Sequence, residues 1–228
     1  MVLWSDIESQ VQTGDLILCH GTGRLSYTIE VVSLSEFSHA TMAVRLKPGG
    51  PVFVWEEVPG PLEGDPETRG AKHPGAQLGP AAKVLADMHQ YGDTPHWLPL
   101  HYDRPPDFDD KVVDVIAGLD GRPFPTMKNM LLHWIEGKLL DVGTGQQSMF
   151  CAELVALTYQ ELGLLKRDPP PNAFDPGSFA RADASKMLQL GARFGTLEEI
   201  TPASSAAPSP TPPAAHPAPA DTPAARTT

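Results

Sequence analysis

The sequence has 228 residues and a formal net charge of −11. This length predicts one or two domains. No cluster of Lys and Arg stands out against the negative charge, which argues against nucleic acid and anionic membrane surfaces as partners. Two cysteines are too few for a disulfide framework or for a four-cysteine zinc site.

Targeting signals are the next feature to consider. No stretch approaches 18 consecutive apolar residues, so we expect no transmembrane segment. The first ten residues are acidic and lack the basic start and the apolar run of a signal peptide. We therefore expect a cytoplasmic protein. The sequence leaves its oligomeric state open.

The composition changes at the C-terminal end. From Thr201 onward the chain consists almost entirely of Pro, Ala, Thr and Ser, and it contains no aliphatic residue larger than Ala and no aromatic residue. Such a segment buries too little apolar surface to offset the entropy lost on ordering. The sequence therefore predicts one globular domain over 1–200 and a disordered Pro/Ala/Thr-rich tail over 201–228.

The first predicted elements are a short helix and a strand. Ser5 and Glu8 have the spacing of a capping box, which predicts a helix ending near Val11. The apolar run Leu16–Cys19 predicts a buried strand that ends in the glycine-rich turn Gly21–Gly23. A helix over 25–35 follows from apolar residues at helical spacing.

A β-hairpin is predicted next. Residues 37–46 alternate between apolar and polar side chains, a turn follows over 47–50, and 52–58 is again typical of a strand. Antiparallel pairing of the two arms brings His39 and Glu56 to the same end of the hairpin. This end of the hairpin is therefore a candidate functional site.

The remaining elements alternate between helices and strands, which favours an α+β fold. A polar, Gly- and Pro-rich excursion is expected over 60–79, and Pro95 and Pro99 predict that the strand 97–102 lies at a sheet edge. The clearest helix covers Phe150–Leu162. Other elements are expected as helices over 80–89, 107–119, 126–140 and 179–190 and as a last strand over 194–200.

Cys151 is the candidate nucleophile. At the start of the predicted helix, free N–H groups and the helix dipole favour a thiolate, which is the nucleophilic form. The alternative is a small apolar residue on a buried helix face. A nucleophilic cysteine also needs an imidazole to take its proton and a third group to orient that imidazole.

The chain offers eight histidines. His39 is distinguished because the hairpin places a carboxylate, from Glu56 or Glu57, within its reach. Neighbouring strand residues point to opposite faces, so only one of these two can serve, and the other reading of Glu56 is an exposed hairpin carboxylate. His20 competes with His39, although a turn residue bonded to the backbone is the alternative for it.

Several motifs now occur in a fixed order. They are Gly14-Asp15, Gly21-Thr22-Gly23, Ser38-His39, Trp55-Glu56 and Phe150-Cys151-Ala152-Glu153-Leu154-Val155, with Asp175-Pro176-Gly177 after the cysteine helix. This set resembles the permuted papain-like cysteine hydrolases, the YiiX-like branch of the NlpC-type superfamily, which is related to the lecithin:retinol acyltransferase-like enzymes. The resemblance runs from Thr13 to Phe179. His39 precedes Cys151, which is the order found in the permuted group.

The resemblance implies a circularly permuted papain-like α+β fold, with an antiparallel sheet packed against helices that include the nucleophile helix. Cys151 would be the nucleophile, His39 the general base and Glu56 the group that orients the imidazole. The backbone N–H of Cys151 would form half of an oxyanion hole, with the second donor left open. Further residues expected at the substrate are His20, Gly21 and Ser38.

The expected function is that of a cysteine hydrolase that cleaves an amide or an ester through a thioester intermediate, with a peptide or amidated small molecule as first choice of substrate. An acyltransferase or lipid thioesterase with the same triad is one alternative, and an inactive binding module of the same fold is another. No cofactor is expected. His96, His101 and Asp103 do not have the spacing of a tetrahedral metal site.

Overall fold

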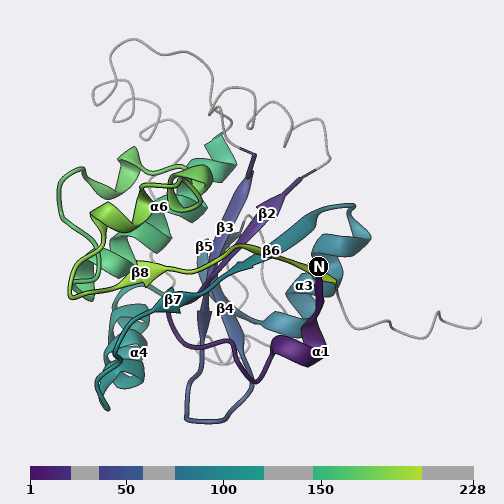
Figure 1. Ribbon diagram of the computed structural model, residues 1–228, viewed down its shortest axis with the longest axis horizontal. Helices are drawn as coiled ribbons and strands as arrows, with labels where there is room; N and C mark the ends of the chain where they lie inside the picture. The colour runs from purple at the N-terminus through teal and green to yellow at the C-terminus, as the bar shows by residue number, and fades with distance from the viewer. Residues whose placement is uncertain (22–35, 59–74, 121–145, 202–228) are drawn as a thin grey trace, which may run out of the picture.

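A mostly antiparallel sheet organises the chain (Figure 1). The computed structural model describes residues 1–21, 36–58, 75–120 and 146–201, so the helices predicted over 25–35 and 126–140 and the predicted tail lie outside the described residues, apart from Thr201. The strand order is β1-β9-β6-β2-β3-β4-β5. The bounds are Val2–Leu3 for β1, Leu16–His20 for β2, His39–Val44 for β3, Phe53–Val58 for β4, Gly75–Pro80 for β5, Thr94–Leu98 for β6 and Glu198–Thr201 for β9. Within this sheet, the β1–β9 pair is parallel.

Helices cover both faces of the sheet, which confirms the α+β class (Figure 1). Helices α4 and α6 pack on one face, and α1 and α3 pack on the other. A second, two-stranded sheet pairs β7 with β8. The bounds are Trp4–Ile7 for α1, Ala81–Gln90 for α3, Phe108–Leu119 for α4, Gln146–Glu161 for α6, Leu100–His101 for β7 and Arg193–Phe194 for β8. Among the described residues, no helix is long and apolar enough to cross a membrane.

The predicted hairpin is confirmed. Strands β3 and β4 are antiparallel, with Met42 opposite Trp55. Alternating residues of the hairpin point to opposite faces of the sheet, and both faces are buried. Met42 and Trp55 belong to the apolar cluster under α6. Ala43 and Val54 belong to the apolar cluster under α3. The predicted strand at 16–19 is β2, which pairs with β3. Strand β3 is therefore paired on both sides, with β2 and with β4, and this pairing holds the end of the hairpin that carries His39.

The region expected to be a polar excursion contains a strand. All six residues of β5 pair with β4, and Ala76 and Leu78 are fully buried. The expectation was wrong because it was based on composition, and glycine and proline favour loops. In the structure, pairing with β4 makes this segment a strand. Pro80 ends the strand at the sheet edge and leads into α3.

The expected edge strand is also placed differently. Strand β6 lies inside the sheet, between β2 and β9. Pro95 is tolerated there because β9 pairs with His96 and Trp97 only, so the missing N–H of Pro95 interrupts no pair with β9. Pro99 separates β6 from β7.

A short N-terminal helix is present, but its capping box and bounds differ from the prediction, and a second helix prediction was wrong. Helix α1 spans Trp4–Ile7, its N-cap residue makes no side-chain capping bond, and Ser5 Oγ donates to the carboxylate of Asp6 instead. Burial of Trp4 and Ile7 sets the position of this helix. The segment expected as a helix over 179–190 consists of 3₁₀ turns over Pro176–Phe179 and Ala184–Met187.

Asp15 anchors the base of β2. Its buried carboxylate accepts hydrogen bonds from the N–H groups of Gln12 (3.0 Å) and Leu100 (2.9 Å), from Trp97 Nε1 (2.9 Å) and from Arg104 (3.0 Å). Burial raises the pKa of Asp15, although these donors oppose that shift. The network ties β2 to the chain around β6 and β7, and so holds the strand that pairs with β3.

Candidate active site

The helix that carries Cys151 begins earlier than the sequence predicts. Helix α6 begins at Gln146 and not at Phe150, so Cys151 is its sixth residue and not its second. Gln is a good helix former, and the helix starts directly after Gly145. Only the first four N–H groups of a helix lack an acceptor within it. We predicted that the N–H of Cys151 is free and forms half of an oxyanion hole. That prediction is therefore wrong.

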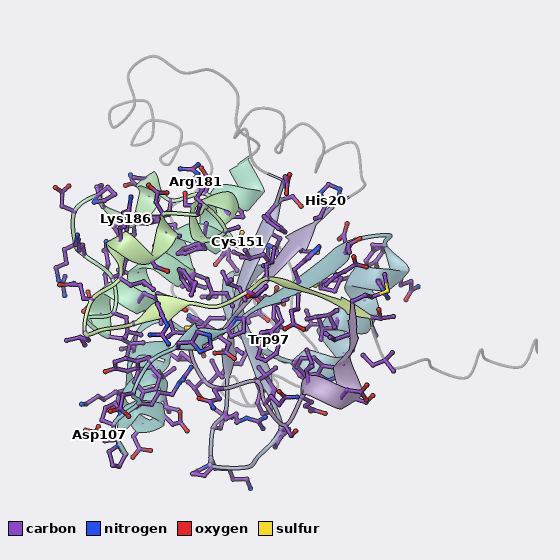
Figure 2. All side chains as sticks on the ribbon, viewed as in Figure 1. His20, Trp97, Asp107, Cys151, Arg181 and Lys186 are labelled. Atoms are coloured by element: carbon purple, nitrogen blue, oxygen red, sulfur yellow. The ribbon has the colours of Figure 1, made fainter. Side chains whose placement is uncertain are left out.

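The Cys151 sulfur lies against the backbone of β3. Its side chain is fully buried, and Sγ accepts a hydrogen bond from the N–H of Ala40 at 3.4 Å. The pairs between β3 and β4 end at Met42, so Ala40 lies beyond the last of them. Figure 2 labels Cys151 on α6 and His20 at the end of β2. Sequence reasoning missed this donor because a backbone N–H has no sequence signal.

His39 and Glu56 form a direct pair. His39 Nε2 lies 2.7 Å from Glu56 Oε2, and the side chains are 25% and 3% exposed. A carboxylate only accepts, so Nε2 carries the hydrogen and donates it. This leaves Nδ1 for Cys151, whose side chain is within hydrogen-bond reach of His39. The structure thus brings together the three residues that the sequence selected.

The surroundings of His39 favour its charged form. Burial by itself lowers the pKa of the imidazole, but the charge and hydrogen bond of Cys151, followed by those of Glu56, raise it well above its usual value. The opposing effects of Cys151 and Glu56 are therefore larger than the desolvation. An imidazolium stabilised beside a sulfur is the arrangement that supports a thiolate.

Glu57 does not take part in this pair. It points to the α6 side of the sheet, where its Oε2 is buried and has no hydrogen-bond partner among the described residues. Burial, and then repulsion from the carboxylate of Glu153 on α6, raise the pKa of Glu57 to about 7. Burial also raises the pKa of Glu153. Of the two carboxylates left open by the sequence, Glu56 is the one that contacts His39.

The residues expected to surround the substrate lie at the same end of the sheet. His20 Nδ1 donates to the carbonyl of Glu36 at 2.6 Å. Ser38 donates its hydroxyl (3.3 Å) and its N–H (2.9 Å) to the carbonyl of Cys19, the residue opposite His39 in β2. Gly21 is buried directly after β2. Their contact with a substrate stays a prediction.

Metal-ligating side chains are the other candidates for a functional site. Across residues 1–21, 36–58, 75–120 and 146–201, no group of three or more His, Cys, Asp or Glu side chains is arranged to hold a metal ion. His96 binds its own strand, with Nδ1 donating to the carbonyl of Thr94 at 3.0 Å.

Fold and site together define an α+β protein with a thiol, an imidazole and a carboxylate in contact at one end of a mostly antiparallel sheet. No protein-family model matches the chain, and no curated protein does either. Among solved structures, the chain is similar to the metalloprotein yiiX from Escherichia coli O157:H7, described as DUF1105, with 18% identity, a TM-score of 0.42 and 67% of each chain covered. At this level of similarity, the assignment of the site depends on its own geometry.

Proposed function

We propose that the protein is a cysteine hydrolase that cleaves an amide or an ester through a thioester on Cys151. The observation that carries this proposal is the contact of Cys151 with His39, together with the 2.7 Å bond from His39 to Glu56. A thiol, a base and a group that orients the base are the parts that nucleophilic acyl transfer requires.

The first half of the reaction forms the thioester. His39 Nδ1 holds the proton of Cys151, and the thiolate attacks the acyl carbon of the substrate. The carbonyl π electrons move to the oxygen, which becomes an oxyanion. When this intermediate collapses, the bond to the amine or alkoxide breaks, and the imidazolium gives its proton to that leaving group. The products of this half are the free amine or alcohol and an acylated Cys151.

The second half regenerates the thiol. Neutral His39 removes a proton from a water molecule that attacks the thioester carbon. The carbon–sulfur bond then breaks, the acid product leaves, and the proton on His39 restores the imidazolium–thiolate pair. Throughout, Glu56 accepts the Nε2 hydrogen and keeps Nδ1 directed at the sulfur and the reacting carbon.

We further propose that the fold is a circularly permuted papain-like fold and that the substrate is a peptide or an amidated small molecule. The order of the site residues supports the fold proposal, since the strand with His39 precedes the helix with Cys151, and α6 packs on the sheet. A lipid thioesterase or an acyltransferase would use the same three residues. The substrate class therefore has to be identified from the acyl group that is trapped on residue 151.

The first test is the reactivity of Cys151. Iodoacetamide should alkylate it at pH 6 much faster than an ordinary thiol, whose pKa is about 8.5. Cys19→Ser serves as the background, because it leaves Cys151 as the single thiol. An alkylation rate at pH 6 equal to that of an ordinary thiol would overturn the proposal.

The second test identifies the acyl group. Cys151→Ser replaces the labile thioester with a slower ester, so incubation with peptide, amide and acyl-ester substrates should leave a mass increment on residue 151. An increment from amides and peptides supports the first choice of substrate. An increment from lipid esters alone would reassign the substrate class while keeping the mechanism.

A further inference from the structure

Gln77 lies directly opposite the carboxylate that orients His39. Strand β5 pairs with β4 so that Gln77 faces Glu56 across the ladder. Gln77 is 1% exposed and Glu56 is 2% exposed. Both side chains project to the α3 side of the sheet, since Val54, two residues before Glu56, belongs to the apolar cluster under α3. Two polar side chains thus lie opposite each other in a buried part of this face.

The buried carboxylate of Glu56 requires a hydrogen-bond donor in addition to the imidazole of His39. Oε2 of Glu56 accepts from His39, and the carboxylate has a second oxygen, Oε1, that also accepts hydrogen bonds. Leaving a charged oxygen without a donor in the interior costs about 1–3 kcal/mol or more. On the other neighbouring strand, the next polar group on this face is Thr41, but its hydroxyl has no hydrogen-bond partner within the part of the chain that the structure describes. Thr41 therefore does not supply that donor.

Gln77 has the right reach and chemistry. Directly opposite residues of an antiparallel pair have Cβ atoms about 4.5–5.5 Å apart, close enough for a Gln amide to meet a Glu carboxylate. The amide nitrogen offers two hydrogens, so it can donate to Glu56 while keeping another partner. Unlike Lys or Arg, it brings no charge that would compete with the imidazolium for the carboxylate.

We propose that Gln77 is a positioning residue of the candidate site, donating from its amide nitrogen to Oε1 of Glu56. This inference rests on the proposed function and extends it by one residue. With Oε1 held from β5, Oε2 stays directed at Nε2 of His39, and Nδ1 stays directed at Cys151. The orientation of the imidazole is then fixed from three strands, β3, β4 and β5.

The test removes the amide and follows the thiol. Gln77→Met keeps the length of the side chain and removes both donors, and Leu78→Met is the matched control in the same strand, because Leu78 belongs to the apolar cluster under α6. The measurement is the pH dependence of Cys151 alkylation by iodoacetamide in the full chain, in the Cys19→Ser background. With Gln77→Met we expect the alkylation rate at pH 6 to fall about tenfold.

Three results separate the possible roles. If Gln77 acts through Glu56, Gln77→Met has no further effect in the Glu56→Gln background, and Gln77→Asn restores part of the rate. A lower melting temperature with an unchanged pH profile shows a purely structural role and overturns the inference, as does an effect that persists in Glu56→Gln. If Glu56→Gln itself leaves the profile unchanged, the proposed function fails at the triad, a result that is distinct from the failure of Gln77 alone.

Discussion

Replacement of Glu57 with Gln is expected to stabilise the protein at pH 8 and to have little effect at pH 4. In the folded protein, burial and the carboxylate of Glu153 raise the pKa of Glu57 from 4.5 to about 7. Below pH 4.5 the carboxyl is protonated in both the folded and the unfolded chain. Between pH 4.5 and 7 only the folded chain keeps the proton, so its stability falls as the pH rises through this window. Above pH 7 the full cost of the buried charge is present.

The size of the effect follows from the same two values. The difference between 4.5 and about 7 corresponds to an upper limit of about 3.4 kcal/mol. Glu57 is only half-buried, so solvent screening reduces this limit, and we expect a gain of about 1–2 kcal/mol for Glu57→Gln at pH 8. Oε2 of Glu57 is buried and has no hydrogen-bond partner among the described residues, so neither water nor a donor stabilises a negative charge on it.

Urea unfolding at pH 4, 6 and 8 measures this change. Asp110→Asn in α4 is the control. Asp110 is exposed, so this substitution removes one negative charge from the surface. Glu153→Gln should reproduce part of the gain because it removes the repulsion. A gain from Glu57→Gln that is the same at all three pH values, or a loss of stability at pH 8, would refute the reasoning.

Three other outcomes are expected. Asp15→Ala leaves four donors, two of them in buried hydrogen bonds, without their acceptor and should lower the free energy of unfolding by about 3–5 kcal/mol in urea titrations, whereas a loss below 1 kcal/mol would contradict the anchoring role. His39→Ala should slow the alkylation of Cys151 at pH 6 by about 10²-fold with little change at pH 10, and a uniform decrease would point to altered access instead. Thr158→Val removes the acceptor of Trp55 Nε1 (3.1 Å) and should cost about 1–2 kcal/mol in thermal unfolding, with Thr158→Ser retaining most of the stability.

The hairpin and the pairing of His39 with Glu56 were predictable because strand alternation has a period of two. Once two arms and a turn are recognised, antiparallel pairing fixes which residues share an end. The choice between Glu56 and Glu57 was not predictable, since it depends on the face of β4 that each side chain occupies. That face is set by the apolar contacts of the whole sheet.

The start of α6 and the strand β5 show where local reasoning fails. Glycines near both segments weigh towards loops, but pairing with β4 makes a strand of residues 75–80, and good helix formers extend α6 back to Gln146. The repulsion between Glu57 and Glu153 acts between residues almost a hundred positions apart, so no local pattern could reveal it. Tertiary packing thus determines the strand β5 and the repulsion between Glu57 and Glu153, whereas local helix propensity accounts for the early start of α6.

The hydrogen bond from Ala40 to the Cys151 sulfur makes one amide a reporter of the chemistry at that sulfur. In the resting protein, this N–H donates to Sγ. Acylation or alkylation adds a substituent to the sulfur and changes its ability to accept this hydrogen bond. The Ala40 amide proton should therefore change its NMR chemical shift and its rate of hydrogen exchange when Cys151 reacts. Under the mechanism that we propose, a spectrum recorded with substrate would distinguish the free from the acylated protein without any change to the site.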